Sequence, residues 1–477
     1  MSDSDSLAAG KHVRLHSRNP QLEADRYIDA LNLSRDIDCY ILIEPGMGYL
    51  IPALRRRCPD SRIIVLHADT VFRSTTISCD TLLPEIARWF PDSSTGIQEF
   101  LEAAIPETAS IRIIEWKPSL RIYGNVCLTL VRESTEFIRR LEAGRRTSAA
   151  FGRRWVRNFF RNTALIRRTL LYRTVDMPIV ITGSGPSLNS AVPAIRAAQE
   201  GVFILAASSS LPALINGGVM PDMVITTDGG AWALLHLHAC FRGDCTPRSP
   251  LLACALTSAL PSQCSDIPLL PMNDGSLWQS MALHSIGIPS VIIPQRGTVT
   301  ASALDLALAL SSGSIFLAGM DLAVRDIQTH ARPYGFDQLF WGVASRLRPV
   351  YSQCFIRSGD MRAGGAHDVY AAWFRNRIAS LPRRIFSIGG NHSAFENNLP
   401  IKPLTAAEHR EKNYFKVMTV NGSPAEQRRR AAETLIAALG EMKYAAGLTG
   451  ELAPLLFPKH AAIQPQKIAD ELRKITL

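Results

Sequence analysis

The sequence predicts an α/β chain with two Rossmann-like parallel-sheet domains and a helical C-terminal tail. Two observations predict the sheets. Short apolar runs rich in β-branched residues alternate with helical segments between residues 38 and 123, and the same alternation begins again at residue 178. A third observation predicts the tail. Ser423-Pro424-Ala425-Glu426 supplies an N-cap serine, a proline at the first helical position and a glutamate at the third, ahead of an apolar stripe.

The alternation divides the 477 residues into four segments. We expect an N-terminal Rossmann-like domain over residues 1–140, a basic helical connector over 141–175, a central parallel-sheet domain over 176–401 and a helical region over 402–477. The strands predicted for the first domain are residues 39–43, 62–66 and 111–115. Those predicted for the central domain are residues 178–182, 202–206, 223–226, 251–254, 290–293, 314–318 and 385–388.

The net charge of +10 comes largely from eleven arginines between residues 139 and 173. Arg153, Arg157 and Arg161 recur at the i, i+4 spacing of one helix face. Such a face could hold nucleic-acid phosphates, but it is more often a solvated or partner-docking surface. Because no nucleic-acid-binding motif accompanies the charge, we expect no specific binding of nucleic acid.

Targeting and redox signals are weak. The first eleven residues are polar, which does not fit a signal peptide. The longest apolar stretch, residues 301–320, is interrupted by Asp305 and by the polar residues 311–314, so we expect no membrane span and a cytoplasmic location. The nine cysteines form no CxxC pair and no cluster with histidine, which indicates neither a disulfide framework nor a zinc site.

The strongest functional motif is the turn Gly183-Ser184-Gly185-Pro186-Ser187, between a predicted strand and a predicted helix. Glycines allow positive φ and close approach of a ligand, and a helix N-terminus presents unpaired N–H groups to an anion. The motif lacks the lysine of a P-loop and the third glycine of GxGxxG. It therefore predicts a nucleotide site, with a tight structural turn as the alternative.

Other polar residues follow neighbouring strands. Ser208 and Ser209 come after the next predicted strand, and Asp228 comes after the one beyond it. Because ligands bind beyond the carboxyl ends of parallel strands, we expect these side chains on the same rim as Gly183. Hydroxyl groups suit ribose and phosphate oxygens, and a carboxylate suits ribose hydroxyls or magnesium. A simple helix cap is the alternative reading of the serines.

A second group lies further along the central domain. Thr298 and Thr300 precede an apolar helix and are further candidates for binding the nucleotide. Asp321 follows the next strand, and His330 lies in a polar loop nine residues later. A carboxylate or a neutral imidazole can accept a proton, so both are candidate catalytic groups, and we expect both near the glycine turn. The alternative for His330 is an ordinary surface histidine.

The N-terminal domain has a possible second site. Glu44, Gly46 and Gly48 follow its first strand, and Asp69 follows its second. The pattern mimics the first motif of methyltransferases, in which glycines approach the cofactor and a carboxylate binds ribose. Two-glycine turns are also common after any strand of a Rossmann-like sheet, so the match leaves both readings open.

Several stretches resemble the motility-accessory-factor (Maf) family of bacterial flagellin glycosyltransferases. They are residues 181–188, 208–209, 221–228 and 319–331 of the central domain, residues 15–20 and 44–49 of the N-terminal domain, and the connector 151–155 with Asn158 and Asn162. The resemblance implies an MptE-like central domain, similar to 6-hydroxymethylpterin diphosphokinases and to bacterial sialyltransferases. It further implies transfer of a nonulosonic, sialic-acid-like sugar from a CMP-activated donor to serine or threonine hydroxyls of flagellin.

The leading expectation is therefore a glycosyltransferase whose substrates are a CMP-activated sugar and flagellin or another protein acceptor. Asp321 or His330 would deprotonate the acceptor hydroxyl, and the glycine turn would hold the donor phosphate. One alternative is a pterin diphosphokinase-like enzyme that uses ATP, with magnesium held by Asp228 and Asp321. Another is a non-catalytic motility or assembly accessory protein. The sequence decides neither the metal requirement nor the oligomeric state.

Overall fold

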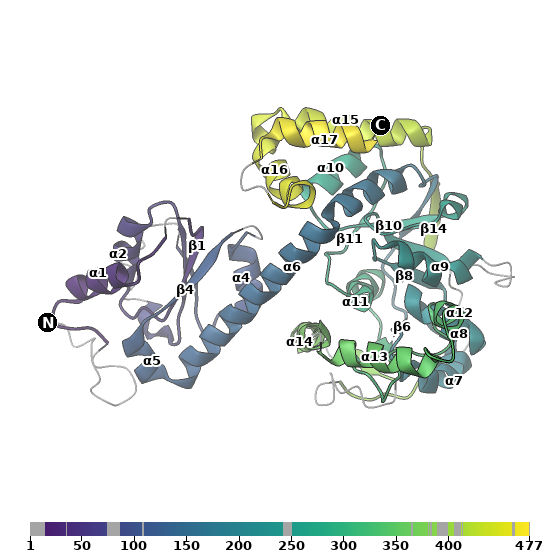
Figure 1. Cartoon of the computed structure of the whole chain (residues 1–477), viewed down its shortest axis with the longest axis horizontal. Coiled ribbons are helices and arrows are strands. Elements are labelled where there is room, and N and C mark those ends of the chain that lie inside the picture. Colours follow the sequence, from purple (N-terminus) through teal and green to yellow (C-terminus); the bar gives the residue numbers. More distant parts are fainter. Residues whose placement is uncertain are drawn as a thin grey trace. The chain divides into compact units, whose positions relative to one another are not determined.

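The computed structural model describes residues 15–476 apart from 35, 74–85, 107–108, 242–249, 364–365, 380, 382–383, 389–398, 405–411, 413 and 460–462. The chain separates into two compact units, Met1–Ser148 and Ala149–Leu477. Each unit contains its own parallel sheet, and helices gather at the C-terminal end of the chain (Figure 1). The predicted α/β class, with two parallel sheets and a helical C-terminus, is confirmed.

Unit 1 is built on a four-stranded parallel sheet in the order β3-β2-β1-β4. The central strand β1 is buried along its whole length, as expected for a parallel strand covered on both faces. The strands are β1 (Cys39–Ile43), β2 (Arg62–Leu66), β3 (Ala87–Trp89) and β4 (Ile111–Glu115). The helices are α1 (Pro20–Ala30), α2 (Leu50–Arg57), α4 (Ile97–Ala104), α5 (Lys117–Tyr123) and the first part of α6 (Asn125–Thr163), with a 3₁₀ turn η2 (Thr70–Arg73).

Unit 2 is built on a larger sheet in the order β13-β12-β6-β7-β8-β9-β10-β5-β14, with β11 beside β10. All pairs are parallel except β14 with β5. The chain begins the parallel core at β6 and moves outward to β10, then returns to place β12 on the other side of β6. The strands are β5 (Arg168–Tyr172), β6 (Ile179–Thr182), β7 (Phe203–Ala207), β8 (Met223–Thr226), β9 (Leu251–Ala255), β10 (Leu269–Asn273), β11 (Val291–Ile292), β12 (Ile315–Ala318), β13 (Ile385–Ser387) and β14 (Phe415–Thr419).

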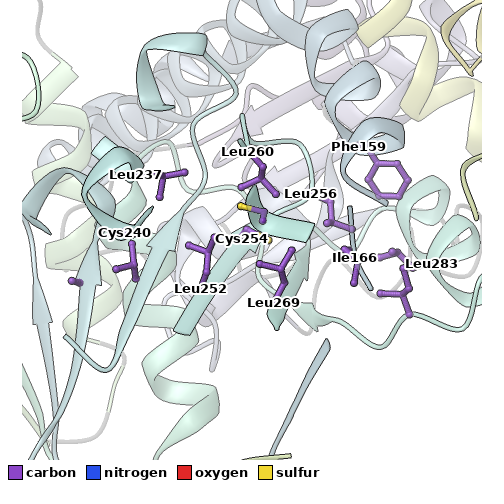
Figure 2. Close-up of a cluster of buried hydrophobic side chains, with 14 of the residues drawn as sticks. Phe159, Ile166, Leu237, Cys240, Leu252, Cys254, Leu256, Leu260, Leu269 and Leu283 are labelled. Atoms are coloured by element: carbon purple, nitrogen blue, oxygen red, sulfur yellow. The ribbon is translucent and has the colours of Figure 1, made fainter. Parts of the chain in front are cut away.

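Helices cover both faces of this sheet. One core contains the end of α6, together with α7, α8, α10 and the three C-terminal helices, and the other contains α11 and α14. Figure 2 shows part of the first core, which contains Phe159 of α6 and Leu283 of α10 together with strand residues such as Leu252 and Leu269. The helices are α7 (Leu188–Ala198), α8 (Leu211–Asn216), α9 (Leu234–Phe241), α10 (Leu277–Ser285), α11 (Val299–Leu310), α12 (Asp337–Gly342), α13 (Val350–Ala363), α14 (Ala366–Ala379), α15 (Pro424–Leu439), α16 (Met442–Leu456) and α17 (Pro465–Thr476).

The last turns of α6 belong to the core of unit 2. The Asn158 side-chain amide donates to the carbonyls of Gly229 and Thr257, and Asn162 donates to two carbonyls that follow β9. These bonds brace the loops at the carboxyl ends of β8 and β9. Arg153 forms an ion pair with Glu471 of α17, so part of the basic face is used inside unit 2.

Two strands lie where the sequence predicts helix or connector. Residues 168–172, placed in the basic connector, form β5, and residues 415–419, placed in the helical tail, form β14. They pair with each other antiparallel at one side of the sheet. Arginines at both ends of the 168–172 run favour the helical reading, so only the pairing with a distant segment identifies the strand. In the part of the chain that the structure describes, no helix has the length and apolarity to cross a membrane.

Candidate functional site

The candidate site lies where the strand order of unit 2 reverses. Strands β6 and β12 are neighbours, and the turns that follow them meet at their carboxyl ends. The Gly183 N–H donates to the Ala318 carbonyl at 2.8 Å, and the Gly185 N–H donates to the Gly319 carbonyl at 2.7 Å. In open α/β sheets this reversal is where ligands bind.

The two glycines of the first turn allow the two turns to interlock. Neither has a positive φ, unlike Gly319, whose φ is 64°. A Cβ on Gly185 would lie 2.0 Å from Asp321 Oδ2, and one on Gly183 would lie 2.5 Å from the Gly319 carbonyl oxygen. The expected reason for these glycines was room for a ligand. The contact between the two turns is sufficient reason on its own.

Asp321 occupies the N-terminus of α7. Its two carboxylate oxygens accept from the Ser187 N–H at 3.2 and 3.1 Å, and Oδ2 also accepts from Ser187 Oγ at 2.8 Å. A carboxylate is stabilised by the positive end of a helix, so the chain's own side chain fills the anion position. Asp321 is buried and engaged in this way, which suits a positioning residue better than a base that must reach an acceptor.

His330 is held beside the glycine turn by three hydrogen bonds from its neighbours. The Ala331 N–H donates to the Ser184 carbonyl at 2.8 Å. The Asn189 side chain accepts from the Arg332 N–H at 2.9 Å and donates to the Arg332 carbonyl at 2.7 Å. The His330 ring stacks on Tyr334 at 4.0 Å, and its Nδ1 lies 2.9 Å from Thr329 Oγ1. The structure therefore brings His330 and Asp321 to the same turn.

The predicted hydroxyl groups lie at the same carboxyl ends. Ser209 Oγ donates to Ser184 Oγ at 2.9 Å, and both side chains are partly exposed, whereas Ser208 is buried. Thr298 caps α11 by accepting from the Ala301 N–H at 3.1 Å, and its hydroxyl lies 3.1 Å from that of Thr300. Within the turn, Pro186 and Ser187 are buried. Ser184 and Ser209 are thus the partly exposed hydroxyl pair of the turn.

Asp228 is exposed at the end of β8, and its Oδ1 accepts from the Gly230 N–H at 2.7 Å. Across the described residues, no three histidine, cysteine or acidic side chains gather as a metal site. Asp228 and Asp321 follow different strands, and the carboxylate of Asp321 is already bound to Ser187.

A group of aromatic residues beside His330 was not anticipated from the sequence. His236 is buried, stacks on Phe336 at 4.7 Å and places Nε2 3.5 Å from Tyr334 Oη, while its Nδ1 has no hydrogen-bond partner among the residues that the structure describes. Burial lowers the pKa of His236 to about 4; the Asp228 carboxylate opposes this shift and Arg357 adds to it. Arg357 lies over the rings of Tyr334 and Phe336 at 5.5 and 5.6 Å.

A cavity of about 470 Å³ opens next to the His330 loop. Its walls come from the segment before His330, from Arg332, and from α13. The lining residues are Arg325, Asp326, Ile327, Gln328, Arg332, Val350, Tyr351 and Cys354. Arg332 lines the cavity and lies two residues after His330, so the cavity adjoins the loop that carries His330. The hydrogen bonds between the Asn189 side chain and the Arg332 backbone hold this part of the loop in place.

The predicted second site in unit 1 has a different character. The Glu44 carboxylate is fully buried and accepts from the N–H groups of Gly46 and Ala68 at 3.1 and 2.6 Å, with His67 Nδ1 3.3 Å away. Gly46 and Gly48 have φ values of 62° and 87°, and a Cβ on Gly46 would lie 2.7 Å from His16 Nε2. Asp69 accepts from the Val71 N–H at 3.1 Å. These contacts give the motif a role within the fold of unit 1.

Residues 154–326 match the family model described as 6-hydroxymethylpterin diphosphokinase MptE-like. This segment of the chain is thus similar to MptE-like proteins. The chain is 28% identical over 212 residues to a 6-hydroxymethyl-7,8-dihydropterin pyrophosphokinase of Methanothermobacter thermautotrophicus, covering 39% of this chain and 79% of that protein. The MptE-like domain predicted from the central motifs is confirmed.

Two further likenesses extend beyond this domain. An uncharacterized protein of Treponema pallidum is 27% identical over 307 residues, which cover 64% of this chain and 66% of that protein. The chain therefore spans just under two thirds of the length of that relative. A solved structure of a MAf glycosyltransferase from Magnetospirillum magneticum AMB-1 aligns with 99% of this chain and 81% of its own, at 14% identity and a TM-score of 0.48. It carries the family name that the motifs resemble, but a likeness of this size assigns no activity.

Proposed function

We propose that this protein is a glycosyltransferase that moves a nonulosonic sugar from a CMP-activated donor to a serine or threonine hydroxyl of a protein acceptor such as flagellin. The observation that carries the proposal is the position of His330. Its loop is hydrogen-bonded to the Ser184 carbonyl, directly beside the partly exposed Ser184 and Ser209 hydroxyls at the reversal of strand order. A proton acceptor and a set of hydroxyl donors thus meet where an α/β sheet binds its ligand.

In this mechanism the donor phosphate binds to the hydroxyls of Ser184 and Ser209, and Asp228 binds the ribose hydroxyls. His330 accepts the proton of the acceptor hydroxyl as its oxygen forms the new bond to the anomeric carbon. The bond from that carbon to the phosphate oxygen breaks, and CMP leaves with the electron pair. The phosphate charge that develops is stabilised by the hydroxyl donors.

Asp321 acts through the turn and not on the substrate. Its carboxylate fixes the Ser187 N–H and hydroxyl, which orients the glycine turn against the loop that follows β12. Tyr334 supports the His330 ring by stacking. The base of the proposed reaction is therefore His330, and Asp321 is a positioning residue.

A pyrophosphokinase is the second candidate, favoured by the alignment with 79% of the Methanothermobacter enzyme and by the exposed carboxylate of Asp228. In that reading Asp228 would help to hold magnesium–ATP. The two candidates differ in the nucleotide that they bind and in the metal that binding requires.

Calorimetry with CMP, and with ATP in the presence and absence of magnesium, separates these candidates. We expect CMP to bind without magnesium. His330→Ala should then lower sugar transfer by about 10² to 10⁴-fold while CMP affinity stays within a few-fold, because the imidazole acts in the transition state. His284→Ala, at an exposed histidine of α10, is the matched control. Binding of magnesium–ATP without binding of CMP would support the kinase, and binding of neither would support a non-catalytic accessory protein.

A further inference from the structure

Helices α12 and α13 expose an unusual run of large apolar side chains. Seven of them are exposed within 18 residues, and Leu347 is 93% exposed. Clusters of this kind on a folded protein mark interaction sites, because isolated exposed apolar residues are normal but runs of them are not. We name this surface the α12–α13 face; it consists of Leu339, Trp341, Val343, Leu347, Tyr351, Phe355 and Ile356.

The most exposed part of the face is a tight turn between the two helices. Ser345 and Arg348 exchange two backbone hydrogen bonds, of 3.0 and 3.1 Å, and leave Arg346 and Leu347 at the tip. The turn therefore presents a leucine between two guanidinium groups on a backbone that is already ordered. The structure describes no ion-pair partner for the side chains of Arg346 and Arg348. A preorganised apolar side chain loses little conformational entropy when it packs against a partner.

The net positive charge of helices α12 and α13 and the turn between them favours an acidic partner. Residues 337–363 contain four arginines, at 346, 348, 357 and 362, and two aspartates, at 337 and 360. Asp337 is already engaged, since its carboxylate accepts from the Tyr334 N–H at 2.8 Å and lies 3.6 Å from Arg332. Two copies of such a basic face would repel each other. An acidic segment would gain on-rate and specificity from the complementary charge.

The α12–α13 face leads into the candidate site. Tyr351 belongs to the face and also lines the cavity of about 470 Å³, together with Val350 and Arg332. Arg332 lies two residues from His330 and is fixed by Asn189. The α12–α13 face and the cavity next to the His330 loop are therefore continuous through Tyr351.

We propose that the α12–α13 face binds an acidic amphipathic helix of the protein acceptor, with Leu347 packing against its apolar face and Arg346 and Arg348 pairing with its carboxylates. The proposal rests on the proposed function in one respect, that the acceptor is a protein. It adds the place where the acceptor binds and the chemistry of the segment that is recognised. In this mode a helix presents its apolar residues at i, i+3, i+4 and i+7 spacing.

The test uses the full chain and a labelled helical peptide of about twenty residues, long enough to form a helix, built from glutamate, leucine, alanine and serine. A second peptide replaces each glutamate by lysine. We expect fluorescence anisotropy to show binding of the acidic peptide and not of the basic one. Leu347→Ser should weaken that binding by about tenfold or more, as expected for an anchor residue, and Arg346→Glu with Arg348→Glu should abolish it.

Matched controls are Met442→Ser, at a methionine that is 98% exposed in α16, and Lys443→Glu, at its exposed neighbour; both should bind the peptide as the unaltered chain does. CMP binding is measured in parallel and should be unchanged in all variants. If the unaltered chain fails to bind CMP, the proposed function fails. If it binds CMP but the acidic peptide does not bind, or binds Leu347→Ser equally well, the docking proposal fails. Leu347-dependent binding to phosphatidylserine vesicles, or Leu347-dependent dimerisation in light scattering, would also overturn it.

Discussion

The two glycine turns of this protein look alike in sequence and differ in structure. Both follow a buried parallel strand and both carry an acidic residue nearby. In unit 1, Gly46 and Gly48 have positive φ, and the Glu44 carboxylate is buried against backbone N–H groups of its own loops. In unit 2, Gly183 and Gly185 have ordinary φ values and are packed against a second turn, that of Gly319 and Asp321.

The difference shows that the position of a turn in the sheet is more informative than its glycines. The unit 2 turn follows β6. Strand β7 lies on one side of β6 and β12 on the other, so the order of the strands reverses at this turn. In unit 1 the position next to Gly46 is filled by the ring of His16. Only the unit 2 turn brings a histidine loop, two partly exposed hydroxyls and a cavity together, which is why the proposed site is there.

Gly185→Val should have the largest effect and should act on unit 2 alone. A Cβ at this position overlaps Asp321 Oδ2 at 2.0 Å and the Gly319 carbonyl at 2.7 Å, so the two turns must separate. We expect a loss of roughly 4 kcal/mol of stability or failure of unit 2 to fold, which is at the upper end for overpacking, together with loss of CMP binding. Thermal unfolding followed by circular dichroism, with calorimetry for CMP, measures both.

Gly46→Ala is the comparison variant. It places a side chain at a φ of 62° and 2.7 Å from His16 Nε2, which should cost about 1–2 kcal/mol in unit 1. CMP affinity should not change. A folded Gly185→Val protein with normal CMP affinity, or a Gly46→Ala protein that has lost it, would reverse the assignment of the two turns.

The sequence predicted most of the parallel strands, because a buried parallel strand can be recognised from its own short run of apolar residues. The strands at 39–43, 62–66, 111–115 and 223–226 have the predicted bounds. Strand β10 was missed because Pro271 stands inside it, and a proline argues against a central strand. Strands β5 and β14 were missed because each is defined by its antiparallel partner some 240 residues away, as in the pair Phe415 and Tyr172.

The candidate site was predictable to the extent that its residues follow strands. Gly183, Ser209 and Asp321 lie within three residues of the ends of β6, β7 and β12, and this placed them on one rim. The clasp of Asn189 on Arg332 and the burial of His236 against Phe336 could not be predicted, because each depends on segments about 100 residues or more apart. The close packing of Gly185 against Asp321 also depends on distant segments. It changes the expected role of Asp321 from catalytic base to positioning residue.

Acid should act on unit 2 through His236. Burial lowers the pKa of this imidazole from 6.5 to about 4. Between these two pH values the imidazole is neutral in the folded state and protonated in the unfolded state. The stabilising contribution is complete above pH 6.5 and is lost as the pH falls towards about 4, amounting to about 3 kcal/mol at roughly 1.4 kcal/mol per pKa unit.

Urea unfolding at several pH values across that window measures the effect. His236→Phe should flatten the pH dependence of unit 2 stability, because a phenyl ring keeps the stacking on Phe336 and cannot be protonated. Exposed His284→Phe is the control and should leave the slope unchanged. An unchanged slope in His236→Phe would show that other groups set the acid sensitivity of unit 2.

Asp321→Asn should have a smaller effect on stability and should separate positioning from base catalysis. The amide keeps one oxygen for Ser187 but loses the negative charge at the N-terminus of α7. We expect a loss of about 2 kcal/mol, typical of a hydrogen bond to a charged group. The pH profile of sugar transfer should keep its shape while its height falls. A profile that loses its acidic limb would identify Asp321 as the base, because a general base is inactive when it is protonated, and weakened magnesium–ATP binding would favour the kinase.

Asn189→Ala should produce the smallest change, about 1 kcal/mol in stability, because its side chain lies at an exposed position and loses two hydrogen bonds to Arg332. Its effect on the reaction should be larger than that figure suggests. The clasp holds the loop of His330 against the turn, and misplacement of a catalytic group by about 1 Å can cost up to 10²-fold in rate. We expect sugar transfer to fall by about tenfold with unchanged CMP affinity. Asn189→Asp retains the oxygen that accepts from the Arg332 N–H and should fall between the two proteins. Equal turnover in all three would mean that the bond from Ala331 to Ser184 alone positions His330, and the distinction between the two turns would then rest on the hydroxyl pair and the cavity.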